Sequence, residues 1–250
     1  MSVVLELKNI SIQINKKEIV TNVNLVVEEC SITGLVGASG SGKTTLFRGI
    51  LNELSSSAKR TGEILLLGNS IHKKFDPRIQ SVNQEASLQF NPKFSLREIL
   101  SEPLEIQKYA IEKIHSELER ILGEISISIE KLDQNIMQFS GGEQQRIQIG
   151  RALLTNPKIL LMDEPVTGLD RLMLRKVKEI LLNQKNKFSI LIITHDLEFA
   201  SEVCDTIYIM KEGKILENGE TKMIFKNSKN EYTKELLKSL DLNTIKQKNN

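Results

Sequence analysis

The chain has 250 residues, long enough for one large α/β domain or two small ones with a well-buried core. Its 34 basic and 32 acidic residues leave a net charge of only +2, so the overall charge gives no indication of a nucleic-acid partner. Cys30 and Cys204 are far apart, which indicates a reducing compartment and no disulfide, and no apolar run reaches the roughly 18 residues of a membrane-spanning helix, so any work at a membrane is expected to need a partner.

The first third of the chain is predicted to be rich in β-strands. Four segments have strand character: residues 3–10, 19–27, 32–36 and 63–68. The first two are separated by polar residues 15–18, which suggests an antiparallel flap beside a central core.

The middle of the chain is predicted to be helical, and the last third alternates between strands and helices. Helical apolar spacing covers residues 96–106, with Pro103 near a break, and continues at 110–122 and 144–154. Continuous apolar runs at 159–162 and 189–193 are typical of parallel strands covered on both faces. The remaining expected elements are a crossover helix at 172–182, strands at 205–210 and 214–217, and a helix at 232–240.

A glycine-rich segment directly follows the expected strand at 32–36. It reads Gly37, Ala38, Ser39, Gly40, Ser41, Gly42, Lys43 and Thr44, and it fits G-x-x-x-x-G-K-[ST] in a strand–loop–helix setting. Its backbone N–H groups and the helix N-terminus would hold the β-phosphate of ATP. Lys43 would reach the β- and γ-phosphates, and Thr44 would ligate Mg²⁺.

Three side chains at the ends of later buried strands suit ATP hydrolysis. Asp163 ends an apolar run at the carboxyl edge of a strand, where it would hold Mg²⁺ through water. Glu164 would orient or deprotonate the attacking water. His195 follows another strand and would hydrogen-bond the γ-phosphate. Alone, each residue is weak evidence, but their order after a phosphate loop indicates an ATPase.

A second candidate phosphate site precedes the helix expected at residues 144–154. Ser140, Gly141, Gly142 and Glu143 place small residues at a helix N-terminus. Because one chain already has a complete first site, this second site predicts that ATP bound to a neighbouring chain contacts it.

With these motifs in this order, the sequence resembles the nucleotide-binding subunits of ABC transporters over nearly its whole length. The resemblance implies an α/β fold: a P-loop NTPase core with a mainly parallel central sheet, an N-terminal antiparallel β flap and an inserted helical subdomain. The nucleotide-binding domain would span residues 1–227, with the helical subdomain at about 85–155, and residues 228–250 would form a C-terminal helix and polar tail.

The resemblance also assigns the site residues. It implies that Glu164 and His195 are the catalytic glutamate and switch histidine, and that Thr44, Gln84 and Asp163 bind Mg²⁺. The loop that crosses the dimer interface would be Gly168, Leu169 and Asp170. The implied ATP-binding residues are Gly37, Ala38, Ser39, Gly40, Ser41, Gly42, Lys43, Thr44, Thr45, Gln84, Asp163, Ser140, Gly141, Gly142 and Glu143.

The resemblance further implies partners and a location. Two ATP-binding subunits, identical or related, would sandwich two ATP molecules head to tail and drive two transmembrane permease subunits. An extracytoplasmic solute-binding protein would act with them indirectly. The chain would lie peripherally on the cytoplasmic face of the cell membrane.

Three positions depart from the family's pattern. No aromatic residue occurs before Phe47, so the usual ring that stacks on adenine is missing, and either Ile12 or Ile14 is expected to offer apolar contact instead. Phe139 replaces the leucine that opens the signature sequence, and Glu143 replaces a glutamine.

A narrower resemblance links the chain to importers of oligopeptides, dipeptides and nickel. It is carried by residues 84–92, 96–104 and 231–237, although Asn230 and Glu231 stand where that branch has His-Pro. The lack of a cysteine after Cys204 leans toward the nickel or metallophore members. We therefore expect uptake of a peptide, nickel or a metal chelate. The alternatives are an importer of another solute, a soluble ABC-type ATPase without membrane partners, and a catalytically silent cassette.

Overall fold

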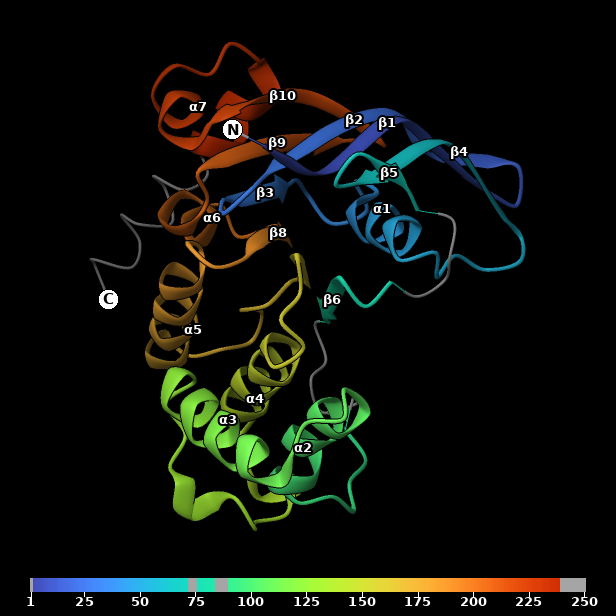
Figure 1. Cartoon of the computed structure of the whole chain (residues 1–250). Coiled ribbons are helices and arrows are strands. Elements are labelled where there is room, and N and C mark those ends of the chain that lie inside the picture. Colours follow the sequence, from blue (N-terminus) through green and yellow to red (C-terminus); the bar gives the residue numbers. More distant parts are fainter. Residues whose placement is uncertain (1, 72–75, 84–89, 239–250) are drawn as a thin grey trace. The chain divides into compact units, whose positions relative to one another are not determined.

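The computed structural model describes residues 2–71, 76–83 and 90–238 (Figure 1). The chain divides into two compact units. The first unit comprises residues 1–76 and 185–250, and the second comprises residues 77–184. Within the described ranges, no helix is long and apolar enough to cross a membrane. The predicted boundaries at 1–227 and 228–250 stay a prediction.

An antiparallel sheet forms the N-terminal part of the first unit. Its strands are β1 (Val3–Ile14), β2 (Lys17–Glu28), β4 (Ala58–Leu66) and β5 (Asn69–Ser70), in the order β2-β1-β4-β5. The predicted flap is therefore confirmed. The strand expected at residues 63–68 ends earlier, because Leu67 and Gly68 adopt the positive φ values of a turn.

A mainly parallel set of strands forms the centre of the same unit. Its strands are β3 (Ile32–Val36), β8 (Ser189–Thr194), β9 (Thr206–Lys211) and β10 (Lys214–Glu220), in the order β10-β9-β3-β8. β3 pairs in parallel with both β8 and β9, whereas β10 is antiparallel to β9. Every residue of β3 and β8 is buried, as the continuous apolar runs predict.

Four helices complete the first unit as described. They are α1 (Lys43–Ile50), α6 (Leu197–Val203), α7 (Thr221–Asn227) and a C-terminal helix at residues 231–238. α7 has no counterpart among the predicted elements. Its helix has no side-chain cap and only two buried residues, Thr221 and Ile224, so its sequence carries little helical signal.

The second unit combines a short parallel strand pair with helices. β6 (Ile79–Val82) pairs with β7 (Ile159–Asp163), and the helices are α2 (Leu96–Ile106), α3 (Ile111–Glu124), α4 (Gly141–Leu153) and α5 (Arg171–Gln184). Two short 3₁₀ helices, η2 (Ile129–Lys131) and η3 (Ile136–Gln138), precede α4. In Figure 1, α2, α3 and α4 (green to olive) lie close together. Along the chain they come after β6 and before β7, as expected of an inserted helical segment.

Two capping boxes define where α2 and α4 begin. Ser95 accepts a hydrogen bond from the Glu98 N–H, and the Glu98 carboxylate accepts one from the Ser95 N–H. Ser140 and Glu143 make the same reciprocal pair at the start of α4. Pro103 lies inside α2, three residues before its end, so the expected break lies just beyond it.

Candidate nucleotide-binding site

The predicted phosphate loop links β3 to α1 within the first unit. At two of its glycines, the loop approaches its neighbours so closely that a side chain is excluded. A Cβ atom on Gly37 would lie 2.2 Å from the Met210 carbonyl oxygen, and one on Gly42 would lie 2.9 Å from the Ile19 carbonyl oxygen. Gly42 also has a φ of +105°, a left-handed conformation that strongly favours glycine. The glycines therefore let the loop pack tightly and turn into the helix.

Three features of this loop suit a polyphosphate. The Lys43 ammonium is buried and donates to the carbonyls of Gly37 at 2.8 Å and Ala38 at 3.0 Å. Among the described residues, no side chain caps the N-terminus of α1, and the N–H groups at such a helix end attract anions. The buried Ser41 hydroxyl has no hydrogen-bond partner among the described residues. Because a buried hydroxyl normally has a partner, this orphan fits a ligand oxygen.

His195 lies at the neighbouring strand end. β3 and β8 are in register with Val36 opposite Thr194, so Gly37 and His195 each follow the paired ends of these two strands. His195 is exposed, and the next residue, Asp196, caps α6 by accepting a hydrogen bond from the Phe199 N–H at 2.9 Å. The first unit thus brings the histidine to the same strand edge as the phosphate loop.

The acidic pair lies in the second unit, at the end of β7. Asp163 is the last residue of this fully buried strand and is 8 % exposed. Glu164 has a φ of +51°, a left-handed conformation that is uncommon for a residue with a side chain. The Thr167 hydroxyl donates to the Glu164 carboxylate at 3.2 Å, and the Thr167 N–H donates to the Glu164 carbonyl at 3.3 Å. The turn therefore holds Glu164 in a specified orientation.

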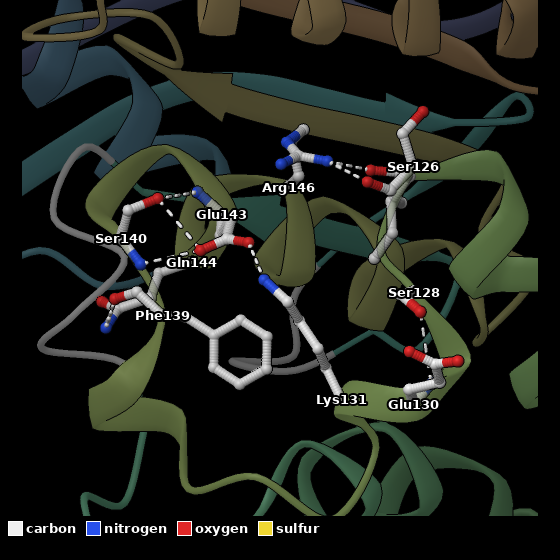
Figure 2. Close-up of polar contacts among 10 residues, drawn as sticks. Ser126, Ser128, Glu130, Lys131, Phe139, Ser140, Glu143, Gln144 and Arg146 are labelled. Carbon is white, nitrogen blue, oxygen red and sulfur yellow. Dashed lines mark hydrogen bonds and ion pairs between the residues drawn. The ribbon is translucent and has the colours of Figure 1, made fainter.

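The predicted signature segment forms the N-terminus of α4 (Figure 2). The Ser140 N–H and hydroxyl donate to the Glu143 carboxylate at 3.0 and 3.1 Å, and Lys131 binds the same carboxylate at 2.6 Å. Burial disfavours the charged form, but donation from Lys131 and Ser140 outweighs it and lowers the pKa of Glu143. Glu143 thus ties the start of α4 to Ser140 and Lys131.

The aromatic residue that opens the segment is part of the core. Phe139 is buried, and the Gln144 side-chain amide donates to the carbonyls of Phe139 and Ile136, both at 3.1 Å. The Lys131 ammonium lies 5.5 Å from the centre of the Phe139 ring. A phenylalanine in place of leucine is therefore accommodated by local packing.

The start of α4 packs against the start of α5. A Cβ atom on Gly142 would lie 2.7 Å from the Met173 Cγ, so this glycine permits close contact between the two helices. Asp170 caps α5 by accepting hydrogen bonds from the N–H groups of Leu172 and Met173, both at 2.9 Å. The second unit thereby brings the signature segment together with the predicted interface loop, Gly168, Leu169 and Asp170.

Gln84 and Ile12 are two predicted site residues that the described structure does not place at the phosphate loop. Gln84 lies outside the described residues. Ile12, one of the two predicted apolar contacts for adenine, is fully buried and packs against α1, where its Cδ1 would lie 2.7 Å from a Cβ on Gly49. It is therefore unavailable to a ligand, whereas Ile14 is partly exposed.

The residues are compatible with Mg²⁺ that arrives with ATP. Within the described ranges, no group of three or more His, Cys, Asp or Glu side chains could hold a metal ion. Mg²⁺ is commonly held by one or two protein groups together with substrate phosphates. Thr44 in the first unit and Asp163 in the second are ligands of that type.

Comparisons with known proteins agree with these motifs. The ABC transporter family model matches residues 20–167. The phosphate import ATP-binding protein PstB 2 of Bacillus subtilis is 32 % identical over 94 % of this chain and 90 % of its own length. The oligopeptide transport ATP-binding protein OppF of Lactococcus lactis is 34 % identical over 88 % of this chain and 72 % of its own length.

Solved structures share the fold. The structure of cbiO1 from Clostridium perfringens, part of the ABC transporter complex cbiONQ, has a TM-score of 0.81 and 24 % identity over 91 % of this chain and 92 % of that one. The ADP conformation of MJ1267, an ATP-binding cassette of an ABC transporter, has a TM-score of 0.78 and 25 % identity over 94 % of this chain and 98 % of that one. The family match spans more than half of the chain, and the chain therefore belongs to the ABC transporter family as one of its ATP-binding, ATP-hydrolysing subunits.

Proposed function

We propose that this chain powers an ABC importer by binding ATP at residues 37–45 and hydrolysing it. The observation that carries the proposal is the phosphate loop of the first unit. A buried ammonium on Lys43, an orphan hydroxyl on Ser41 and an uncapped helix N-terminus all belong to this one loop. Positive charge, oriented N–H groups and a spare hydroxyl are the groups that a polyphosphate requires.

The remaining residues would act on the bound nucleotide. Lys43 would exchange its contacts with the loop carbonyls for the β- and γ-phosphates, and Thr44 and Asp163 would hold Mg²⁺, which neutralises phosphate charge when bound. Glu164, oriented by Thr167, would accept a hydrogen bond from the attacking water. His195 would hydrogen-bond the γ-phosphate and respond to its loss. Gln84 would add a further Mg²⁺ contact.

A second ATP-binding subunit, identical or related, would complete each site. Ser140, Gly141 and Gly142 would bind the γ-phosphate held by the other subunit, with Glu143 holding Ser140 in place. The close packing of Gly142 against Met173 supports this role, because it brings the N-termini of α4 and α5 together, and Asp170 caps the α5 end. Residues 168–170 would then cross the same interface.

The proposed partners follow from the family. The chain would act on the cytoplasmic face of the membrane with two permease subunits, and a solute-binding protein would deliver the solute. We propose a peptide, nickel or metal chelate as the solute, supported by residues 231–237 and by the similarity to OppF. Phosphate is the second candidate, because the relative named PstB 2 matches over 94 % of this chain.

Transport measurements test the proposal. The gene would be deleted, and uptake of nickel, a short peptide, phosphate and methionine would be compared with that of cells complemented by the wild type or by Lys43→Ala. Loss of one uptake activity that only the wild type restores would support the importer and identify its solute. Unchanged uptake of all four, with ATPase activity that co-purified membrane proteins do not affect, would favour a soluble ATPase.

A further inference from the structure

The C-terminal helix at residues 231–238 reaches the phosphate loop within the first unit. Its second residue, Tyr232, accepts a hydrogen bond from the Ala38 backbone N–H at 3.4 Å. Ala38 is the second residue of the loop, and its carbonyl also accepts a hydrogen bond from Lys43 at 3.0 Å. One loop residue therefore connects the C-terminal helix to the ammonium that is proposed to bind phosphate.

A second contact fixes the Tyr232 ring. The Lys211 ammonium lies 4.4 Å from the ring centre, within the range of a cation–π interaction. Lys211 ends β9, directly after Met210, whose carbonyl oxygen touches the backbone at Gly37. The hairpin that carries Lys211 also braces the far side of the loop, because the Gly213 N–H donates to the Ser41 carbonyl at 2.9 Å. The Tyr232 ring therefore contacts the end of β9, and the hairpin that follows β9 is hydrogen-bonded to the phosphate loop.

A carboxylate anchors the start of the same helix. Glu217 on β10 accepts hydrogen bonds from the Ser228 hydroxyl at 2.6 Å and the Lys229 N–H at 2.8 Å. The Asn230 side chain then accepts a hydrogen bond from the Tyr232 N–H at 2.9 Å, which caps the helix. Although partial burial opposes ionisation of Glu217, these donors outweigh it and lower its pKa. Tyr232 is therefore held in place from both its backbone and its ring.

We propose that Tyr232 is a positioning residue for nucleotide binding, which sets the geometry of the phosphate loop through the Ala38 N–H. This inference rests on the proposed ATP-binding role of residues 37–45. The hydroxyl holds the loop's first turn, and through the Ala38 carbonyl it restrains Lys43.

The test compares Tyr232→Phe with the wild type of the full chain. The variant keeps the ring over Lys211 and loses only the hydroxyl. Binding of ADP with Mg²⁺, measured by calorimetry, is expected to weaken about three- to tenfold, the effect of one lost hydrogen bond. KM for ATP should rise by a similar factor with kcat nearly unchanged, and the unfolding temperature without nucleotide should stay within about 2 °C. Lys211→Met should also weaken binding, and Lys211→Arg should restore it.

Tyr109→Phe is the matched control, because the Tyr109 ring carries Lys113 at 4.5 Å in the second unit. It should leave ADP binding unchanged. An ADP affinity of Tyr232→Phe within about 1.5-fold of the wild-type value would overturn the proposal. A loss of affinity accompanied by a fall of more than about 4 °C in unfolding temperature would also overturn it, because it would indicate a purely structural residue. Lys43→Ala separates the two ideas: if it also binds ADP normally, the loop assignment fails, whereas loss of binding only in Lys43→Ala refutes the role of Tyr232 alone.

Discussion

Removing the Glu143 side chain should destabilise the protein at the start of α4. Glu143→Ala deletes two interactions: the hydrogen bonds that the carboxylate accepts from the Ser140 N–H and hydroxyl, at 3.0 and 3.1 Å, and the 2.6 Å ion pair with Lys131. The Glu143 side chain is 19 % exposed and the Lys131 side chain 38 %, so the pair is partly screened by solvent. Both interactions occur in the folded chain.

The expected magnitude follows from these two interactions. The Ser140 hydroxyl still accepts a hydrogen bond from the N–H of residue 143 in this variant. Loss of the hydrogen bonds from Ser140 to the carboxylate costs about 1 kcal/mol, and loss of a partly exposed ion pair adds about 0.5–1 kcal/mol. For a chain of this size, 1 kcal/mol corresponds to roughly 2–4 °C, so Glu143→Ala should lower the unfolding temperature by about 3–8 °C. Glu143→Gln keeps an acceptor for Ser140 and loses only the charge, so its effect should be about 0.5–1 kcal/mol.

The effect of the charge should depend on pH in one direction. Burial disfavours the ionised carboxylate, but Lys131 and Ser140 outweigh it and hold the pKa of Glu143 below its ordinary value. A depressed folded-state pKa gives stabilisation that is complete above the unfolded-state pKa and is lost as the pH falls through the folded-state pKa. The stability difference between the wild type and Glu143→Gln should therefore be present at pH 7 and shrink below about pH 4.

A double-mutant cycle measures the pair itself. Thermal unfolding of wild type, Lys131→Met, Glu143→Gln and the double variant at pH 7 should give a coupling of about 0.5–1 kcal/mol. Lys234 and Glu231 form a control pair at the same 2.6 Å distance, but Glu231 is 83 % exposed, so Lys234→Met should change stability little. Additive effects of the Lys131 and Glu143 substitutions, or a coupling that persists unchanged at acidic pH, would refute this reasoning.

Three further predictions concern the nucleotide. Lys43→Ala should abolish ATP hydrolysis and weaken ATP binding strongly, because it removes the one side-chain cation of the loop at residues 37–44; near-normal turnover with assembled permeases would contradict the assignment. Glu164→Gln should still bind ATP while turnover falls about 10²-fold or more, and size-exclusion chromatography in ATP should show a dimer; full turnover with a monomeric profile would reject it. The affinity for GTP should be within about tenfold of that for ATP, since the missing stacking contact is worth about 1 kcal/mol, and Ile14→Tyr should tighten ATP binding. A preference for ATP by orders of magnitude in competition binding would show that another ring contacts the base.

Elements with strong local signals could be predicted to the residue. β3 and α2 coincide with the predicted ranges, because β3 is a continuous apolar run before a glycine and α2 begins with a capping box that the sequence displays. β6 could not be predicted in this way. Its four residues include two polar ones, and its strand geometry comes from pairing with β7, a partner about 80 positions later in the chain.

The motifs of the candidate site could be located for a similar reason. The phosphate loop, acidic pair and signature segment are contiguous in the sequence, so a role could be predicted for each without the fold. Lys131 and Tyr232 could not be identified, because each contacts a motif through a loop or a helix that the sequence pattern does not connect to it. Lys131 reaches Glu143 across 12 positions and Tyr232 reaches Ala38 across 194, and no spacing rule links either pair.

The choice between Ile12 and Ile14 shows how register limits sequence reasoning. Alternation along a strand places residues two apart on the same face, so both isoleucines were equal candidates for contact with adenine. The pairing of β1 with β2 shifts register between Ile12 and Gln13: Ile12 lies opposite Val20, whereas Ile14 lies opposite Lys17. The extra residue of this bulge lies in β2, and Ile14 is the last residue of β1, beside the turn at Asn15 and Lys16. Ile12 is consequently buried against α1, whereas Ile14 is partly exposed, so a tyrosine introduced to stack on adenine belongs at position 14 and would overpack the core at position 12.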